Sequence, residues 1–181
     1  RAPMCSIRSD RPFQIILLDF TGPLPLTKSK NRNIITGIDH YSKHAEADAT
    51  KNQYASTVAK FVLDKFIYRF GVPTYIITDK GKNFESELIK EISKLFKIHK
   101  LRTSGYHPQT NGLVERFHKT LKQTLRINVD KNQNDWGENL QKVVFFYNST
   151  KQASTNYSPY EILFGFHPID QSKLDCSNKH E

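Results

Sequence analysis

The pattern of apolar and polar positions predicts three strands near the start of the chain. Residues 14–20 form one such run, interrupted only near its end by Asp19, as is typical of a strand buried on both faces of a sheet. Residues 33–39 and 44–49 predict a second and a third strand. We expect the three strands to pair as a meander.

From residue 54 onward the spacing of apolar positions changes to the helical period. It predicts a helix over 54–70, which Gly71 and Pro73 end. A second amphipathic pattern predicts a helix over 84–97. The other expected elements are short strands at 74–78 and 98–102, a loop over 104–112, and helices at 113–129, 135–151 and 158–164.

This order of strands and helices predicts a mixed sheet between helical layers, which is an α/β fold. A chain of 181 residues has the length of one compact domain with a sizeable core. We therefore assign residues 12–168 to a single folded core, residues 1–11 to the end of a linker, and residues 169–181 to a polar tail.

The charge balance points to a polyanionic partner. Lys and Arg total 27 and Asp and Glu total 18, which gives a net charge of +9. Nucleic acid is the first candidate. An anionic membrane is disfavoured because no apolar run approaches about 18 residues and Trp136 is the single tryptophan. With Cys5 and Cys176 alone, a disulfide scaffold and a Cys-x-x-Cys zinc site are excluded, and we expect an intracellular setting.

Three acids are candidates for a metal site. Asp19 lies in the first apolar run, Asp79 follows the strand at 74–78, and Glu115 lies near the start of a helix. An acid in an apolar strand is costly unless it is paired, hydrogen-bonded or metal-bound. Carboxylates brought together favour a hard cation such as Mg²⁺, and two such ions support phosphoryl transfer. A lone strand-end Asp is more often a turn former or a helix cap, so the interpretation depends on the combination.

The helix at 113–129 carries one acid and three bases on a narrow stripe. With Glu115 at 0° and about 100° per residue, Lys119 lies at about 40°, Lys122 at about −20° and Arg126 at about 20°. Such a stripe is either a solvated face with weak Glu–Lys pairs or a helix that holds a metal at its start and follows a phosphate backbone. The apolar residues on the opposite side are Leu113, Val114, Phe117, Leu121 and Leu125.

Taken together, the motifs resemble the catalytic core of retroviral and LTR-retrotransposon integrases, most closely the Ty3/gypsy-like branch. The gap between Asp79 and Glu115 is 115 − 79 − 1 = 35 residues, which is the gap of that family. The resemblance covers roughly residues 12–168. The matching segments are the acid motifs at 18–25, 78–84 and 106–116, the second-strand motif at 39–43, and the closing motif at 158–165.

The resemblance implies a ribonuclease-H-like fold, with a five-stranded mixed sheet flanked by helices. It implies that Asp19, Asp79 and Glu115 bind two Mg²⁺ or Mn²⁺ ions. Two reactions are implied at one site: water trims the 3′ end of the element, and the new 3′-OH then attacks target DNA. We expect at least a dimer, no small-molecule cofactor, and action in the nucleus after passage through the cytoplasm.

The resemblance also suggests which residues contact DNA. Lys119 and Lys122 occupy the positions four and seven after the Glu that contact DNA in the family, and Arg126 extends the same stripe. The loop from Tyr106 to Gly112 is similar to the family loop that touches DNA ends. Its candidate contacts are Tyr106, His107, Gln109 and Asn111.

Alternatives to an active integrase core stay open at this point. A domesticated, integrase-derived protein would bind nucleic acid without turnover. A transposase of the wider acid-triad superfamily would share the fold and the chemistry, although the motifs at 107–110 and 158–161 favour the retroelement branch.

The histidines are interpreted as non-catalytic. His107 and His118 are left outside the catalytic set, because a metal lowers the pKa of the attacking oxygen without a separate base. His40 and His44 have a metal-like spacing without paired cysteines, so we interpret them as ordinary sheet and turn residues.

Overall fold

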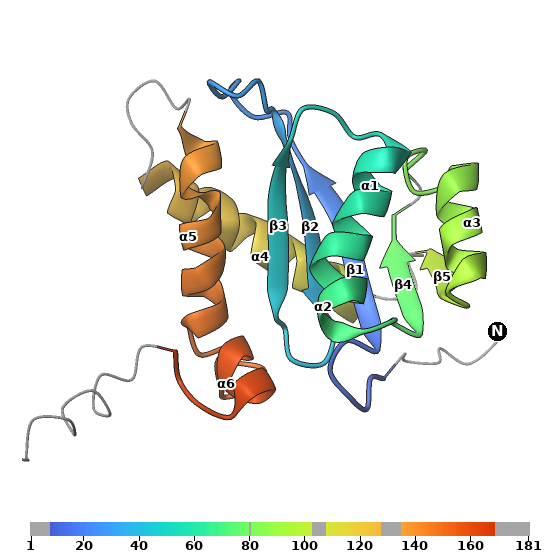
Figure 1. Cartoon of the computed structure of the whole chain (residues 1–181). Helices are drawn as coiled ribbons and strands as arrows, with labels where there is room; N and C mark the ends of the chain where they lie inside the picture. The colour runs from blue at the N-terminus through green and yellow to red at the C-terminus, as the bar shows by residue number, and fades with distance from the viewer. Residues whose placement is uncertain (1–7, 80, 103–107, 128–134, 169–181) are drawn as a thin grey trace, which may run out of the picture.

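The computed structural model describes residues 8–79, 81–102, 108–127 and 135–168, which build a five-stranded sheet flanked by helices (Figure 1). The strand order is β3-β2-β1-β4-β5. β1 pairs antiparallel with β2, and β2 with β3, whereas β1–β4 and β4–β5 are parallel pairs. The predicted mixed sheet is therefore confirmed. The strands are β1 Ile15–Thr21, β2 Asn33–Asp39, β3 Ala45–Thr50, β4 Tyr75–Thr78 and β5 His99–Arg102.

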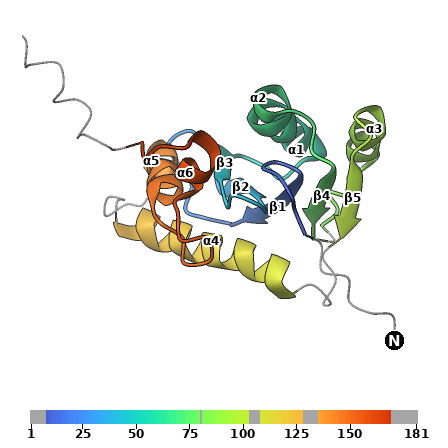
Figure 2. The ribbon, with the colours of Figure 1, turned by 90° about the horizontal axis from the view of Figure 1, so that it is seen from below.

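Helices cover both faces of this sheet. Figure 2 shows α1, α2 and α3 on one face and α4 on the other, and α5 packs beside β3. None of the helices in the described ranges is long and apolar enough to cross a membrane. Their bounds are α1 Ala55–Val62, the π-helix η1 Leu63–Ile67, α2 Tyr68–Phe70, α3 Glu87–Leu95, α4 Pro108–Ile127, α5 Trp136–Ser149 and α6 Pro159–Phe164.

Three of the expected helices differ from the prediction. The helix expected over 54–70 is interrupted by the π turn of η1, which buries both Phe66 and Ile67. The helix expected from residue 84 begins after Ser86, whose hydroxyl accepts a hydrogen bond from the Ile89 N–H at 3.4 Å. The loop predicted over 104–112 is wrong from residue 108 onward, because α4 begins at Pro108, a residue well suited to the first helical turn.

Alternate residues of β1 face opposite helical layers. Ile15 and Leu17 pack in the cluster that includes the apolar side of α4 and α5, whereas Ile16 and Leu18 pack in the cluster that includes α1 and α3. By the same alternation, Asp19 faces the layer that contains α4. The side-chain period of a strand thus directs the first candidate acid toward the helix that carries Glu115.

Candidate active site

The three candidate acids come from three separate elements and line one cavity of about 190 Å³. Asp19 lies near the carboxyl end of β1, and Asp79 directly follows β4, its parallel neighbour. Their carboxylates therefore meet at the same edge of the sheet, and α4 brings Glu115 to that edge. The other residues that line the cavity are Leu17, Leu18, Ile77 and Val114.

The carboxylates share this cavity without converging on one point. The Phe20 N–H donates to Asp19 Oδ1 at 2.7 Å, and the Gly81 N–H donates to Asp79 Oδ1 at 2.8 Å. Within the described ranges, no three His, Cys, Asp or Glu side chains are arranged to hold a metal ion as they lie. Like charges repel in the absence of a cation between them. The carboxylate oxygens are nevertheless the donors that Mg²⁺ prefers, so the residues fit a hard divalent cation in kind.

The environment of Asp19 disfavours its charged form. Burial raises the pKa of Asp19 to about 6. The hydrogen bond from the Phe20 N–H opposes this rise, the charge of Asp79 adds to it, and the charge of Lys122 opposes it. A cation placed between the carboxylates would favour the ionised form and relieve this cost.

The side of α4 opposite its core stripe is basic and exposed, as predicted. Lys119, Lys122 and Arg126 are exposed together with Glu115. The stripe therefore leads from the acid cavity along the outer surface of the helix. Its apolar counterparts Leu113, Phe117, Leu121 and Leu125 are at most 7% exposed.

The predicted contacts that precede the stripe are only partly described. Gln109 and Asn111 lie in the first turn of α4, but their side chains fall outside the described part of the structure. Tyr106 and His107 lie outside the described residues altogether. Their expected contacts with DNA remain predictions.

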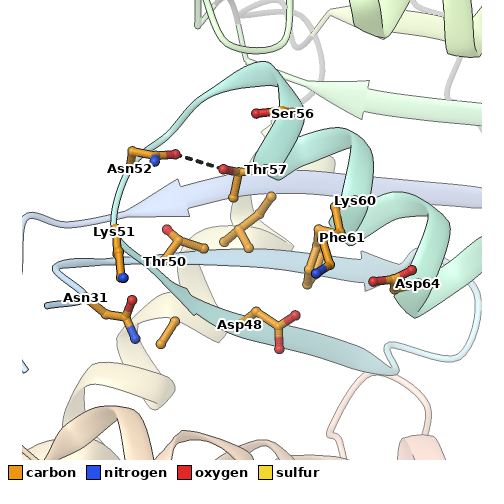
Figure 3. A pocket seen from close by; sticks show the side chains of 12 residues that line it. Asn31, Asp48, Thr50, Lys51, Asn52, Ser56, Thr57, Lys60, Phe61 and Asp64 are labelled. Carbon is orange, nitrogen blue, oxygen red and sulfur yellow. Dashed lines mark hydrogen bonds between the residues drawn. The ribbon is translucent and has the colours of Figure 1, made fainter. Parts of the chain in front are cut away.

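A larger cavity, of about 520 Å³, lies between β3 and α1 (Figure 3). None of the three candidate acids lines it. Its walls carry both signs of charge, and Asp48 pairs with Lys65 at 2.9 Å. At its upper end in Figure 3, the Thr57 hydroxyl donates to Asn52 Oδ1 at 2.8 Å. The largest cavity is therefore not the one that the candidate acids line.

Two family models match this chain. A model described as "Integrase core domain" matches residues 9–108, and a second model with the same description matches residues 97–155. The first match alone covers more than half of the chain. The chain belongs to the integrase core domain family.

Curated relatives of this integrase core are much longer than it is. It is 34% identical over 156 residues to the retrovirus-related Pol polyprotein from transposon 412 of Drosophila melanogaster, which covers 86% of this chain and 13% of that protein. It is 32% identical over 169 residues to the Gag-Pol polyprotein of koala retrovirus, covering 93% of this chain and 10% of that protein. The chain thus spans about a tenth of the length of these two polyproteins.

Solved structures agree with the fold of this integrase core. The HTLV-2 integrase catalytic core domain in complex with magnesium superposes with a TM-score of 0.70 at 20% identity, over 86% of this chain and 99% of that one. The catalytic core domain of BIV integrase gives a TM-score of 0.66 at 24% identity, over 83% and 93% of the two chains. The expected ribonuclease-H-like fold is confirmed.

His118 lies next to Asp19 in this integrase core, although it was left out of the predicted set. Its Nδ1 is 3.7 Å from Asp19 Oδ2, and its Nε2 is 2.8 Å from Thr36 Oγ1. The Thr36 hydroxyl donates to the backbone oxygen of Asp19 at 3.2 Å, so its own oxygen is free to accept from His118 Nε2–H. The signal in the sequence was the spacing: His118 is three residues after Glu115, on the same side of α4.

Burial also fixes the charge of this histidine. It lowers the pKa of His118 to about 4, and the nearby charge of Lys122 adds to the effect. The ring is therefore neutral at pH 7 and makes no ion pair with Asp19. We interpret His118 as part of the scaffold that positions the backbone of Asp19 through Thr36.

The second-strand motif of the integrase core serves the fold. Asp39 is fully buried and accepts hydrogen bonds from the Phe13 N–H at 2.9 Å and from the Ser42 hydroxyl at 2.6 Å. His40 Nδ1 lies 2.8 Å from the Ser9 hydroxyl, and His44 Nε2 lies 3.3 Å from Glu46 Oε1. These neighbours agree with the interpretation of both histidines as ordinary sheet and turn residues.

Proposed function

We propose that this integrase core is a metal-dependent polynucleotidyl transferase, which processes DNA 3′ ends and joins them to target DNA. One observation carries the proposal: Asp19, Asp79 and Glu115, which come from β1, the segment after β4 and α4, line a single cavity. The exposed basic stripe of α4 starts at the same place. A cluster of carboxylates beside a row of cations suits a reaction on a phosphate backbone.

The carboxylates of Asp19, Asp79 and Glu115 would hold Mg²⁺ or Mn²⁺, with two ions expected from the family resemblance. Bound there, the metal supplies charge neutralisation at the phosphate and lowers the pKa of the attacking oxygen. The HTLV-2 core, which shares the fold, was solved in complex with magnesium. Ionisation of Asp19, which burial disfavours, would accompany metal binding.

The reaction itself requires positioning more than proton transfer by side chains. In the first step a water oxygen attacks a phosphorus near the DNA 3′ end, and the bond to the bridging 3′ oxygen breaks. The freed 3′-OH then attacks a phosphorus of target DNA, whose bridging 3′ oxygen leaves. Lys119, Lys122 and Arg126 bind phosphates and keep the strand in line. His118 stays neutral and keeps Asp19 in place.

The assembly and the location of the protein are part of the same proposal. The HTLV-2 core domain was solved in dimeric and trimeric forms, and a simian T-cell lymphotropic virus intasome shares the fold, with a TM-score of 0.73. We propose that this chain acts as at least a dimer on element ends and target DNA, in the nucleus.

The test is a disintegration and strand-transfer assay on short branched DNA, with Mg²⁺ or Mn²⁺ and then with chelator. We expect metal-dependent products from the wild type and a loss of at least about a hundredfold in Asp79→Asn. The matched control is Asp64→Asn, which removes the same charge from an exposed acid of η1 that is outside the acid cavity. DNA binding without turnover, equal in wild type and Asp79→Asn and unaffected by chelator, would instead favour a domesticated binding module.

A further inference from the structure

Another cavity, of about 270 Å³ and here called the second cavity, lies farther along α4 than the acid cavity. It is formed by residues 23–25 of the loop after β1, by Lys122, Leu125 and Arg126 of α4, and by Trp136 at the start of α5. Lys122 links the two cavities, because it lines the second one while its charge acts on Asp19 in the first. A DNA strand that is held at the acids and runs along the basic stripe would therefore pass the opening of the second cavity.

The walls of the second cavity are held in place by hydrogen bonds. The indole N–H of Trp136 donates to the Pro25 carbonyl at 2.7 Å, and the Leu24 N–H donates to the Arg32 carbonyl at 2.7 Å. Trp136 is 3% exposed and Leu125 is 5% exposed. The cavity is thus preformed rather than opened by a ligand, which lowers the cost of binding into it.

The chemistry of the lining selects a particular kind of group. The buried side chains are apolar, and the single polar atom of Trp136 is already used by Pro25. Exposed at the opening are Lys122 and Arg126, the two charged side chains of the lining. An occupant should therefore have a largely apolar body with negative charge next to it, as the base and phosphate of a nucleotide within a strand provide.

The size of the cavity limits that occupant to one base. A volume of about 270 Å³ lies just below the range of about 300–1,000 Å³ that is usual for small-molecule sites. A base that enters this cavity is separated from the partner strand by the loop and α4 that line it, so it must be unpaired.

The geometry of α4 gives the position of that base. Lys122 and Arg126 lie seven and eleven residues after Glu115, or about 10 and 16 Å along the helix at about 1.5 Å per residue. At about 3.4 Å per nucleotide of a stacked strand, this is about three to five nucleotides from the acids.

We propose that this cavity, formed by residues 23–25, α4 and Trp136, binds one unpaired nucleobase of the reacting DNA strand, about three to five nucleotides from the phosphate at the acid cavity. The proposal rests on the proposed function, because it takes the acids as the point where the strand reacts. It adds a preference for DNA whose strands are separated close to the reacting phosphate.

The experiment scans a branched DNA in which 2-aminopurine, whose emission reports stacking, replaces one base at a time. The junction fixes the register, and Ca²⁺ in place of Mg²⁺ keeps the DNA intact. With the wild-type chain we expect a change of emission confined to one or two neighbouring positions within the predicted window. A uniform response along the strand would overturn the subsite.

Two variants of the same loop separate occupation of the cavity from other effects of the loop. Leu24→Trp fills the cavity, whereas Leu26→Trp adds the same side chain at a position that is 58% exposed and outside the lining. Leu24→Trp should remove the position-specific signal and weaken binding of the unpaired DNA by about fivefold to a hundredfold, the range for loss of one base contact. Leu26→Trp should change neither, and fully paired DNA should bind alike to all three proteins.

The outcomes distinguish this proposal from the proposed function. Equal behaviour of Leu24→Trp and Leu26→Trp, in a chain whose wild type still joins DNA with Mg²⁺, would overturn the subsite alone. A position-specific signal in a wild type without metal-dependent turnover would support the subsite and overturn the enzyme. A wild type that binds no DNA would overturn both.

Discussion

On the face of the sheet that meets α1 and α3, β1 and β2 present Ile16, Leu18 and Ile35, all at most 3% exposed. On the face that meets α4, the same β1 strand begins with Ile15 but continues to Asp19. Within β1, the residues on one face are apolar along the whole strand, whereas those on the other face change from apolar to polar toward its carboxyl end. The alternation of a strand therefore lets one set of residues build the core while the other set carries the candidate chemistry.

The two faces differ in what they contribute to stability. The α1 face gains from close packing, as the rings of Phe61 and Phe66 against Gly37 show. The α4 face includes a carboxylate whose pKa is raised by burial, and this charge opposes folding at neutral pH. The integrase core thus keeps an unfavourable group where a cation and DNA would use it.

The largest loss of stability is expected on the packed face. In Gly37→Ala the added Cβ would overlap the ring of Phe66 and lie 3.1 Å from Phe61 Cε1. We expect the free energy of unfolding to fall by about 1–3 kcal/mol, as overpacking of a core does. Thermal and urea denaturation measure this change.

The control for that variant is Gly137→Ala in α5. Its Cβ would meet Thr27 Cγ2 at an ordinary distance of 3.4 Å, and we expect no loss of stability. Equal melting curves for the two variants would mean that the α1 face is not tightly packed at Gly37.

Removal of the Asp19 carboxyl from the α4 face should raise the free energy of unfolding. Asp19→Asn removes a carboxyl whose pKa is raised from 3.8 to about 6. After allowance for screening of a side chain that is 32% exposed, we expect the metal-free variant to gain about 1–2 kcal/mol of stability at pH 7.5. Activity should be lost in the same protein.

The pH dependence of stability follows from the direction of this shift. As pH rises from 3.8 to about 6, the folded state keeps a proton that the unfolded state has lost, so Asp19 lowers the stability of the wild type. In Asp19→Asn, the free energy of unfolding should fall less over this pH range than it does in the wild type. Urea titrations at several pH values measure the difference. If the stability of the variant had the same pH dependence as that of the wild type, the pKa of Asp19 would not be raised in the folded state.

A smaller effect is expected from the residue that supports Asp19. His118→Phe keeps the bulk of the ring but removes the hydrogen bond to Thr36, so the strand-transfer rate should fall by about tenfold. His118→Gln retains an amide that can donate to Thr36 and should recover most of the rate. If both variants join DNA as fast as the wild type at equal folded fraction, His118 has no positioning role.

The smallest effect concerns a single phosphate contact. Lys119→Gln should reduce the slope of log affinity against log salt concentration by about one and weaken DNA binding only a few-fold at physiological salt. Lys142→Gln removes an exposed charge from α5, outside the stripe, and should leave the slope unchanged. Fluorescence anisotropy at several salt concentrations compares the two.

Local patterns were sufficient to predict much of the fold and of the acid cavity. The strands fall within one residue of the predicted bounds, and the clearest of them, β1, leaves a nearly continuous apolar run because it is buried on both faces. The two faces of α4 follow from its period, except that Val114, expected on the side opposite Glu115, lines the acid cavity with it. Asp19 and Asp79 could be expected at one edge of the sheet because each lies near the carboxyl end of a predicted strand, whereas the pairing of β1 with β4 is known only from the structure.

The remaining features depend on contacts between distant residues. His118 meets Thr36 across 82 positions of the chain, and Trp136 meets Pro25 across 111. Neither pair leaves a periodic signal in the sequence. The π turn of η1 likewise reflects packing of Phe66 against β2 rather than a local propensity.

The most direct measurement of the central claim is calorimetric titration of Mn²⁺ into the chelator-treated protein. We expect the wild type to bind Mn²⁺, and Asp79→Asn and Glu115→Gln each to lose most of that binding, because their carboxylates line one cavity with Asp19. Asp64→Asn should bind as the wild type does. Equal Mn²⁺ binding by the wild type and all three variants would contradict the claim that these acids form one metal site.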